Sequence, residues 1–459
     1  MAERGTELEL LADLEARLNA AIPAFRWSAE INLKLERIDS LLQRLGRPER
    51  AYPVVHVGGT SGKGSVAASI ASALSHGGSR VGLHLSPYVQ TLTETWQLDG
   101  RHLLPSRVLP TAIDVIAAAS EISADLPFGP VSYFETKVAI AFKLFAEEAV
   151  DAAVIEVGLG GTRDATNVVR PRVSVLTNVG LDHTEILGDT VEQIAADKAG
   201  IIKPGSVVVS GVTQPTVKSI IRRRAADVGA RAMIVGDDIR FRSAGSRLTV
   251  AWADRECAVD IQGDWTGFQM QNAVLAIVAA LEFNPRLRPA EVSAGLAAVR
   301  LPARFERFSE SGRSIVLDGA HNADKVCATA AAIAQRFPDA KRVAVVALKD
   351  TKDARSILAA LTPLFGSFVL TTFSAGLWHA APPEELASCL AALGYGGGVT
   401  VQPDPALAVE AALAATPAGG LLAVIGSFYL AGNVRGRWVP PLTDVLRGGA
   451  YDLGAQVRR

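Results

Sequence analysis

The chain has 459 residues, and its 46 Lys and Arg residues against 47 Asp and Glu residues give a formal net charge of −1. Hydrophobic residues make up 49% and charged residues 20%, which is typical of globular domains and excludes a disordered or fibrous chain. The charge balance provides no basic excess for a nucleic-acid backbone, so we expect no nucleic-acid partner. At about 150 residues per domain, the length predicts two or three domains.

The cysteine content and the distribution of apolar residues indicate a cytoplasmic protein. The three cysteines have no CxxC spacing, which favours a reducing compartment over a disulfide framework or a thiolate zinc site. The longest uncharged run, residues 411–434, contains Pro417 and the Gly419-Gly420 pair, so it predicts a helix end, a turn and a buried strand rather than a membrane span. The first residues are acidic and amphipathic and lack the apolar centre of a signal peptide. We therefore expect no membrane partner.

The first half of the chain alternates between predicted helices and strands. Helical spacing of apolar residues predicts helices over 7–49, 66–74 and 137–148, and short apolar runs predict strands over 52–57, 152–157, 173–176 and 207–212. Strands separated by helices predict a parallel sheet that is covered on both faces. The fold class is therefore α/β.

The second half predicts a change of pattern and then a second α/β domain. Residues 240–261 alternate over short distances and predict antiparallel hairpins, and 270–283 predicts a helix. A new alternation of strands and helices then begins near residue 307 and predicts a smaller, doubly wound, Rossmann-like domain. We thus expect a first domain over 1–298, a linker over 299–306 and a second domain over 307–459.

A glycine-rich loop follows the first predicted strand and precedes a helix. Glycines let several backbone N–H groups point at one anion, and the helix N-terminus adds a partial positive charge. The loop does not match GxxxxGK[ST], because Val57 and Gly64 stand at two of its fixed positions. An accidental turn is the alternative, but the strand before and the helix after favour a nucleotide loop. The predicted phosphate-binding residues are Gly59, Thr60, Ser61, Gly62, Lys63, Gly64 and Ser65.

The variant loop GTSGKGS (59–65) resembles the loop of the Mur ligase superfamily and, within it, of the folylpolyglutamate synthase/dihydrofolate synthase family. Other segments resemble the family in the same order along the chain. These are Ser86-Pro87, SYFE (132–135), EVGLGGTRDATNVV (156–169), TNVGLDHTEILGDTVEQIAADKAGIIKPG (177–205), LDGAHN (317–322) and IGSFYL (425–430). The resemblance implies a P-loop ATPase domain with a parallel sheet and a C-terminal glutamate-ligase domain.

The resemblance also implies two magnesium sites beside the phosphates of ATP. Glu156 and His183 each follow an apolar run, at the strand ends where open α/β sheets present functional groups. The family assigns metal binding to Ser65, Ser86, Glu156 and His183, and potassium is an additional cation of the family. Oxygen ligands suit magnesium, whereas an imidazole suits manganese equally well.

Lys198 has two interpretations. Taken alone, a lysine in AADKAGIIK is most often a solvated helix residue. The family often carries a carbamylated lysine at this place, whose anionic group serves the second metal, and the resemblance therefore implies the same modification of Lys198. Carbon dioxide reacts with a neutral amine, and burial would favour that form.

The remaining site residues are carried over from the family. Asn272 in GFQMQNA matches the asparagine that contacts the nucleotide, and Arg304 in LPARFE matches the linker arginine that reaches the phosphates. A surface salt bridge is the alternative for Arg304. Asp318 and His321 match the loop that holds the amino acid and the adenine side of ATP, with His321 and Asp318 together as a helper that deprotonates the amine. Ser427 is expected to contact the glutamate.

The resemblance implies an ATP-dependent ligase that adds L-glutamate to a folate, and also to dihydropteroate, through an acyl phosphate. The protein is expected to be a monomer. A Mur-type peptide ligase acting on a nucleotide-sugar acceptor is one alternative, although only about one helical segment precedes the phosphate loop. A P-loop switch NTPase is the other alternative, and it would not need LDGAHN. The loop from Tyr88 to Gly100 and Phe268 depart from the family pattern, so the acceptor stays open.

Overall fold

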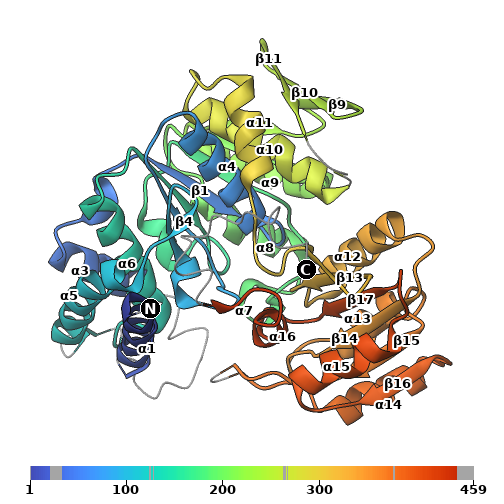
Figure 1. Cartoon of the computed structure of the whole chain (residues 1–459). Coiled ribbons are helices and arrows are strands. Elements are labelled where there is room, and N and C mark those ends of the chain that lie inside the picture. Colours follow the sequence, from blue (N-terminus) through green and yellow to red (C-terminus); the bar gives the residue numbers. More distant parts are fainter. Residues whose placement is uncertain are drawn as a thin grey trace. The chain divides into compact units, whose positions relative to one another are not determined.

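The computed structural model describes residues 2–20, 34–123, 126–127, 129–261, 265, 267–375 and 378–441. Parts of two predicted segments, 21–33 and 442–459, lie outside the described residues. The chain forms two compact units (Figure 1). Among the described residues, the first comprises the chain up to Pro87 together with Leu92–Val299, and the second comprises Tyr88–Thr91 and residues 300–441. Residues 300–306 of the predicted linker therefore belong to the second unit.

An eight-stranded sheet forms the centre of the first unit, in the order β4-β3-β2-β5-β1-β6-β7-β8. All neighbours from β2 to β8 are parallel, and β3 and β4 are antiparallel at one edge. The strands are β1 (Val54–Gly58), β2 (Val81–His84), β3 (Trp96–Leu98), β4 (Arg101–His102), β5 (Ala152–Glu156), β6 (Val173–Leu176), β7 (Val207–Ser210) and β8 (Arg231–Ile234). Because β1 and β5 are buried along their whole length, they have the continuous apolar sequence of a sheet covered on both faces.

The register aligns the carboxyl ends of the central strands. Val57 lies opposite Glu156, and Gly58 lies opposite Leu176. The loops that follow β1, β5 and β6 consequently leave the sheet at one edge, where ligands bind in open α/β sheets.

Helices and short helical turns surround this sheet in the first unit (Figure 1). The helices are α1 (Ala2–Ala20), α3 (Leu35–Arg44), α4 (Lys63–His76), α5 (Pro105–Ser123), α6 (Tyr133–Glu147), α7 (Thr184–Leu187), α8 (Val191–Lys198), α9 (Pro215–Asp227), α10 (Phe268–Phe283) and α11 (Pro289–Ala298). The turns are η1 (Pro48–Arg50), η2 (Leu92–Thr95), η3 (Ala165–Val168) and η4 (Ala199–Ile201). No described helix is both long enough and apolar enough to cross a membrane.

Side chains of the SYFE segment (132–135) cap the N-terminus of α6. The Ser132 hydroxyl accepts the Glu135 N–H at 3.3 Å, and the Glu135 carboxylate accepts the Ser132 N–H at 2.6 Å. This reciprocal capping satisfies two donors at the helix start. The same carboxylate forms a buried ion pair with Arg37 of α3 at 3.0 Å, so the helix start is also joined to the N-terminal helices.

The hairpins predicted over 240–261 are present. Strands β9 (Ile239–Ala244), β10 (Arg247–Trp252) and β11 (Arg255–Asp260) form a separate antiparallel sheet in the order β11-β10-β9. Trp252 on β10 is buried, and its indole N–H donates to Glu282 of α10 at 2.8 Å.

The second unit contains a six-stranded sheet in the order β12-β13-β17-β14-β15-β16. Only β12 is antiparallel to its neighbour. The strands are β12 (Glu306–Glu310), β13 (Arg313–Asp318), β14 (Arg342–Val346), β15 (Ser367–Leu370), β16 (Gly398–Val401) and β17 (Leu421–Ile425). The sequence did not predict the edge strands β12 and β16, and β12 begins at the last residue of the expected linker.

Helices cover both faces of this second sheet, as the doubly wound prediction requires. Helices α12 (Ala323–Arg336), α13 (Ala354–Leu361) and α14 (Pro383–Ala392) contribute to one apolar cluster, and α15 (Pro405–Ala415) and α16 (Phe428–Arg435) contribute to another. Because β17 lies beside β13, with Ile425 opposite Asp318, the loops after these two strands leave the sheet together.

Two buried histidines make the first unit sensitive to acid. Burial lowers the pKa of both His56 and His84 from 6.5 to about 3. Below pH 6.5 the unfolded chain therefore binds protons that the folded chain does not bind. We expect each histidine to reduce the free energy of unfolding by about 1.4 kcal/mol per pH unit as the pH falls from 6.5 toward 3. Chemical denaturation at pH 7 and pH 5 measures this slope.

Replacement of one buried histidine measures how much that residue contributes to the pH dependence of the free energy of unfolding. His84→Gln should flatten the loss of stability between pH 7 and pH 5, whereas His76→Gln, at an exposed residue of α4, should leave the slope as it is. An unchanged slope in His84→Gln would contradict the assignment.

Candidate functional site

The phosphate loop runs from the end of β1 to the start of α4 in a conformation that requires glycine. Gly59 has a φ of +136° and Gly62 a φ of +83°, both in the range that side chains disfavour. Space is also restricted at the first position, because a Cβ on Gly59 would lie 1.9 Å from the Thr177 Oγ1 atom. The Val66 N–H donates to the Gly62 carbonyl at 2.9 Å, so the preceding amides of Lys63, Gly64 and Ser65 lie in the first turn, where helix geometry provides no partner.

Two residues after β6 hold this loop, and the sequence analysis did not select them individually. The Thr177 hydroxyl donates to the Ser61 carbonyl at 2.7 Å. Asn178 accepts the Thr60 N–H on its carbonyl at 3.0 Å and the Ser61 N–H on its side chain at 2.8 Å. These hydrogen bonds fix the loop. Their position could have indicated this role, because Thr177 and Asn178 directly follow a predicted strand and begin the TNVGLDH segment.

Asn272, the predicted nucleotide contact, lies beside the phosphate loop. It belongs to the first turns of α10, and a Cβ on Gly62 would lie 2.7 Å from its Oδ1 atom. A side-chain amide at this distance from the loop backbone can donate to a phosphate oxygen bound there.

The structure also brings together two of the predicted metal ligands. Glu156 ends β5 with 2% of its surface exposed, and its Oε2 atom accepts the Ser86 N–H at 2.8 Å. A buried carboxylate suits a hard cation, because magnesium prefers oxygen ligands. Ser65 is half-buried in the first turn of α4. These three residues fit a magnesium ion in their chemistry.

His183 lies in a more exposed place. It precedes α7 with a φ of +53°, and its ring nitrogens lie 3.9 Å from the Asp182 carboxylate and 3.7 Å from the Glu185 carboxylate. Among the described residues, no group of three or more His, Cys, Asp and Glu side chains could hold a metal ion. The predicted ligand set thus depends on the hydroxyl groups of Ser65 and Ser86.

Lys198 is buried, contrary to the common behaviour of a helix lysine. It ends α8 with 4% of its surface exposed, and its Nζ atom donates to the Gly59 carbonyl at 3.1 Å. Burial raises the pKa of the adjacent Asp197 carboxyl, and the positive charge of Lys198 opposes that rise. The lysine thus reaches the backbone of the phosphate loop from a helix more than a hundred residues later in the chain.

The loop after β5 is packed directly on the end of α8. A Cβ on Gly160 would lie 2.5 Å from the Asp197 carboxylate, and one on Gly161 would lie 2.7 Å from the Lys198 Cα atom. The Thr162 N–H and hydroxyl both donate to the Asp197 carbonyl, at 3.0 and 2.8 Å. Gly160 and Gly161 therefore allow the loop that begins at Glu156 to pack directly against the end of α8, which carries Lys198.

A buried hydrogen-bond network around Asp164 stabilises the loop after β5. Asp164 accepts the Leu159 N–H at 2.8 Å and the Thr166 N–H at 3.0 Å, and the Thr166 hydroxyl lies 2.8 Å from the His56 Nε2 atom. Desolvation raises the pKa of Asp164, while these hydrogen bonds oppose the rise. The DATN segment is thus an internal support for the loop.

In the second unit, Asp318 and His321 have different neighbours. The Asp318 carboxylate accepts the N–H groups of Phe305 at 2.7 Å and Ala320 at 2.9 Å. The His321 Nδ1 atom donates to the Gly319 carbonyl at 2.8 Å, and Lys325 lies 3.2 Å from its Nε2 atom. We expected Asp318 and His321 to act together as an acid–base pair. In the structure, each of the two side chains has other hydrogen-bond partners.

Ser427 and Arg304 complete the predicted set. The Ser427 hydroxyl accepts the Tyr429 N–H at 3.0 Å and caps α16. The Arg304 guanidinium lies 5.0 Å from the centre of the Phe428 ring, within the range of a cation–π interaction. Phe428 was not selected from the sequence, where an aromatic residue after a buried strand is most simply interpreted as core.

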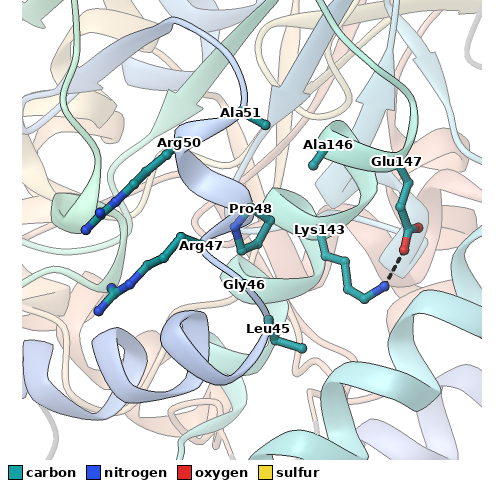
Figure 2. A pocket seen from close by; sticks show the side chains of 9 residues that line it. All are labelled: Leu45, Gly46, Arg47, Pro48, Arg50, Ala51, Lys143, Ala146 and Glu147. Atoms are coloured by element: carbon teal, nitrogen blue, oxygen red, sulfur yellow. Dashed lines mark hydrogen bonds and ion pairs between the residues drawn. The ribbon is translucent and has the colours of Figure 1, made fainter.

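A cavity of about 610 Å³ elsewhere in the first unit includes none of the predicted site residues (Figure 2). Its lining contains the cationic side chains of Arg47, Arg50 and Lys143. Each of these cations pairs with a carboxylate, namely Asp39, Glu49 and Glu147 respectively. Each cation of the lining thus has a carboxylate partner nearby.

The comparisons with known proteins place this arrangement among the Mur ligases. Residues 57–280 match the Mur ligase middle domain, and residues 303–428 match the Mur ligase glutamate ligase domain. The chain is 34% identical to the dihydrofolate synthase/folylpolyglutamate synthase of Mycobacterium tuberculosis over 374 residues, which cover 75% of this chain and 76% of that protein.

Two solved structures are similar over almost the whole length. Folylpolyglutamate synthase of Mycobacterium tuberculosis complexed with ADP superposes with a TM-score of 0.83 at 31% identity, covering 94% of this chain and 99% of the other. A bifunctional folylpolyglutamate synthase/dihydrofolate synthase with Mn, AMPPNP and L-glutamate bound has a TM-score of 0.77 at 26% identity, covering 87% and 92%.

Substitution of the first loop glycine tests the packing of the phosphate loop. In Gly59→Ala the new methyl group would collide with Thr177, and the backbone would also be strained, so we expect unfolding to become easier by more than the roughly 1–2 kcal/mol of a left-handed residue alone. Gly78→Ala is the matched control, because Gly78 has a φ of +87° with open space around it. Chemical denaturation compares the two variants, and equal losses would show that Thr177 does not confine the loop.

Proposed function

Because the chain belongs to the Mur ligase superfamily and, within it, to the folylpolyglutamate synthase/dihydrofolate synthase family, we propose that it is an ATP-dependent ligase that joins L-glutamate to a folate. Dihydropteroate is the second acceptor in this proposal. The observation that carries it is the preformed phosphate loop, which has Lys63 at the start of α4, Asn272 beside it and the buried Glu156 at the end of the neighbouring strand β5.

The chemistry requires activation of a carboxylate. A carboxylate oxygen is a poor leaving group, so an amide forms only after the acceptor carboxylate attacks the γ-phosphorus of ATP and releases ADP. The glutamate amine then attacks the acyl phosphate carbon, loses a proton, and inorganic phosphate leaves with its bond electrons. Charge accumulates on the transferring phosphoryl oxygens, and fixed donors stabilise it.

The first unit supplies those donors. The side chain of Lys63 and the first-turn amides of α4 would bind the phosphates, and the helix N-terminus adds its partial positive charge. Because Thr177 and Asn178 already hold the loop, these donors need little rearrangement when the nucleotide binds. Preorganisation of this kind is the main source of electrostatic catalysis.

A divalent metal belongs to the same site. The buried carboxylate of Glu156, with the hydroxyl groups of the half-buried Ser86 and of Ser65 in the first turn of α4, is suited to magnesium. The metal would neutralise phosphate charge when bound. We include two metal sites in the proposal, with His183 as a further ligand and potassium as an additional cation.

Carbamylation of Lys198 is a separate part of the proposal. Its support is burial: the side chain is almost inaccessible and lies beside the backbone of Gly59. As an ammonium it places a positive charge against the loop, whereas a carbamate would place a negative charge there that suits a second metal. Formation of the carbamate requires that the amine loses its proton before its nitrogen bonds to carbon dioxide.

The second unit would bind the amino acid. His321 and Ser427 follow neighbouring strands of its sheet, where doubly wound sheets bind ligands. Arg304 would contact phosphate oxygens, for which a planar guanidinium is well suited. We further propose that the protein acts as a cytoplasmic monomer without a nucleic-acid partner, from its charge balance and cysteine content.

Release of ADP tests the ligase function. With ATP, magnesium and L-glutamate, we expect ADP release when a reduced folate or dihydropteroate is added, and little without an acceptor. Lys63→Ala should reduce the rate by roughly a hundredfold or more, as loss of one preorganised donor does. Lys218→Ala is the matched control, because this lysine pairs with Asp237 on the first unit.

The same assay distinguishes the alternatives. Turnover only with a UDP-muramoyl acceptor would indicate a Mur-type peptide ligase. Hydrolysis of ATP that proceeds equally without glutamate and without acceptor would indicate a P-loop switch NTPase, and either result contradicts the proposal.

The modification of Lys198 has its own test. Native mass spectrometry at neutral pH should find a mass increase of one carbon dioxide in the wild type and none in Lys198→Arg. The arginine keeps the positive charge but cannot form the carbamate, so we expect the rate to fall by about tenfold or more. A wild-type rate in Lys198→Arg would show that no carbamate is needed.

A further inference from the structure

The segment that carries Arg304 has an unusual backbone. Ala303 has a φ of +51° and Phe305 a φ of +55°, so residues on both sides of Arg304 adopt the left-handed conformation that side chains disfavour. Neither residue is a glycine. A conformation of this kind persists only when surrounding contacts impose it, and these contacts therefore determine how Arg304 is presented.

The end of β13 and the loop that follows it supply two of the contacts. The Phe305 N–H donates to the Asp318 Oδ2 atom at 2.7 Å. The Gly319 N–H donates to the Ala303 carbonyl at 2.8 Å. Both left-handed residues are thus tied to Asp318 at the end of β13 and to the residue that follows it, within the second unit.

A buried ion pair supplies the third contact. The Ala303 N–H donates to the Glu306 Oε2 atom at 2.9 Å. The same carboxylate forms a two-pronged ion pair with Arg435 of α16, with a shortest distance of 2.9 Å, and Arg435 is completely buried. The segment is therefore attached to α16 as well as to the β13 loop.

Asp318 has the hydrogen bonds of a structural connector. While its Oδ2 atom accepts the Phe305 N–H, its Oδ1 atom accepts the Ala320 N–H at 2.9 Å and the Thr329 hydroxyl at 3.0 Å. Three donors from the linker, the loop and α12 thus converge on one carboxylate. Charge-assisted hydrogen bonds of this kind are strong, and they fix the carboxylate in one orientation.

Phe428 supports the side chain that the strained backbone presents. Its ring lies 5.0 Å from the Arg304 guanidinium and 5.8 Å from the His321 ring, which meets it edge-on at 61°. Gly319 allows this packing, because a Cβ there would lie 2.2 Å from the Phe428 ring. The guanidinium and the imidazole therefore share one aromatic support.

We propose that Asp318 and Phe428 are positioning residues for Arg304: Asp318 holds the left-handed linker and Phe428 supports the guanidinium, so that Arg304 has one fixed orientation within the second unit before ATP binds. Asp318 then acts through Arg304 rather than by touching the glutamate substrate. This inference rests on the proposed ligase function, which supplies the nucleotide.

Steady-state kinetics of single and double variants test the coupling. We expect Asp318→Asn, Phe428→Leu and Arg304→Ala each to raise KM for ATP by roughly tenfold, with KM for glutamate within about twofold of wild type. The double variant Asp318→Asn/Arg304→Ala should be no worse than Arg304→Ala alone, because the tether has no further role once the guanidinium is gone. Asp404→Asn, which removes a carboxylate cap from α15 in the same unit, is the matched control and should not change either KM.

Hydrogen exchange gives a readout that does not need activity. The Phe305 amide should be protected in the wild type, and Asp318→Asn should lose that protection, whereas Asp404→Asn should keep it. Unchanged protection in Asp318→Asn, a raised KM for glutamate, or additive effects in the double variant would each overturn the proposal. If no acceptor gives turnover in the wild type, the ligase function fails, and the exchange experiment still decides whether Asp318 holds the linker.

Discussion

The close approach of three backbone segments around the phosphate loop is the constraint on which the first unit depends. Gly59 lies against Thr177, Gly160 lies against Asp197, and Gly161 lies against the backbone of Lys198. Interiors are packed so densely that such approaches are possible only where no Cβ intervenes. The glycines of two loops therefore serve one purpose, which is to bring the ends of β1, β5 and α8 to the same place. Glu156 and Lys198 owe their position to this packing, and each is almost entirely buried.

Buried carboxylates organise the loops in both units. Asp164 supports the loop after β5, Asp197 lies under its glycines, and Asp318 gathers donors from three segments. Desolvation raises the pKa of all three, and hydrogen bonds to neighbouring donors oppose that rise. Asp164 and Asp318 each accept several hydrogen bonds, which hold these desolvated carboxylates in one orientation. These residues thus give rigidity to loops whose glycines would otherwise leave them many conformations.

Much of this arrangement could be predicted from the sequence, because it is encoded locally. The strand, glycine loop and helix around Lys63 and the hairpins of 240–261 follow from periodicity and turn chemistry. The edge strand β12 was missed, since ERFSE has the exposed, charged residues that an edge strand tolerates. Burial of Lys198 could not be inferred from AADKAGIIK, because it results from contact with a loop far away in the chain. The hydrogen-bond partners of Asp318 could not be predicted for the same reason. Phe305 reaches Asp318 only because its backbone is left-handed, and a phenylalanine in the sequence gives no indication of that conformation.

The strand order of the second unit has a consequence for how that unit forms during synthesis. β17 is the last of its six strands in chain order, yet it lies between β13 and β14. A ribosome therefore releases both flanking strands before the strand that joins them exists. Until then their apolar edges have no partner, and such intermediates are vulnerable to aggregation and depend on chaperones. Pairing of β13 with β17 spans about a hundred residues of chain, which predicts slow closure of the sheet by a late, non-local step. The pairing that places Asp318 opposite Ile425 is thus expected to form late.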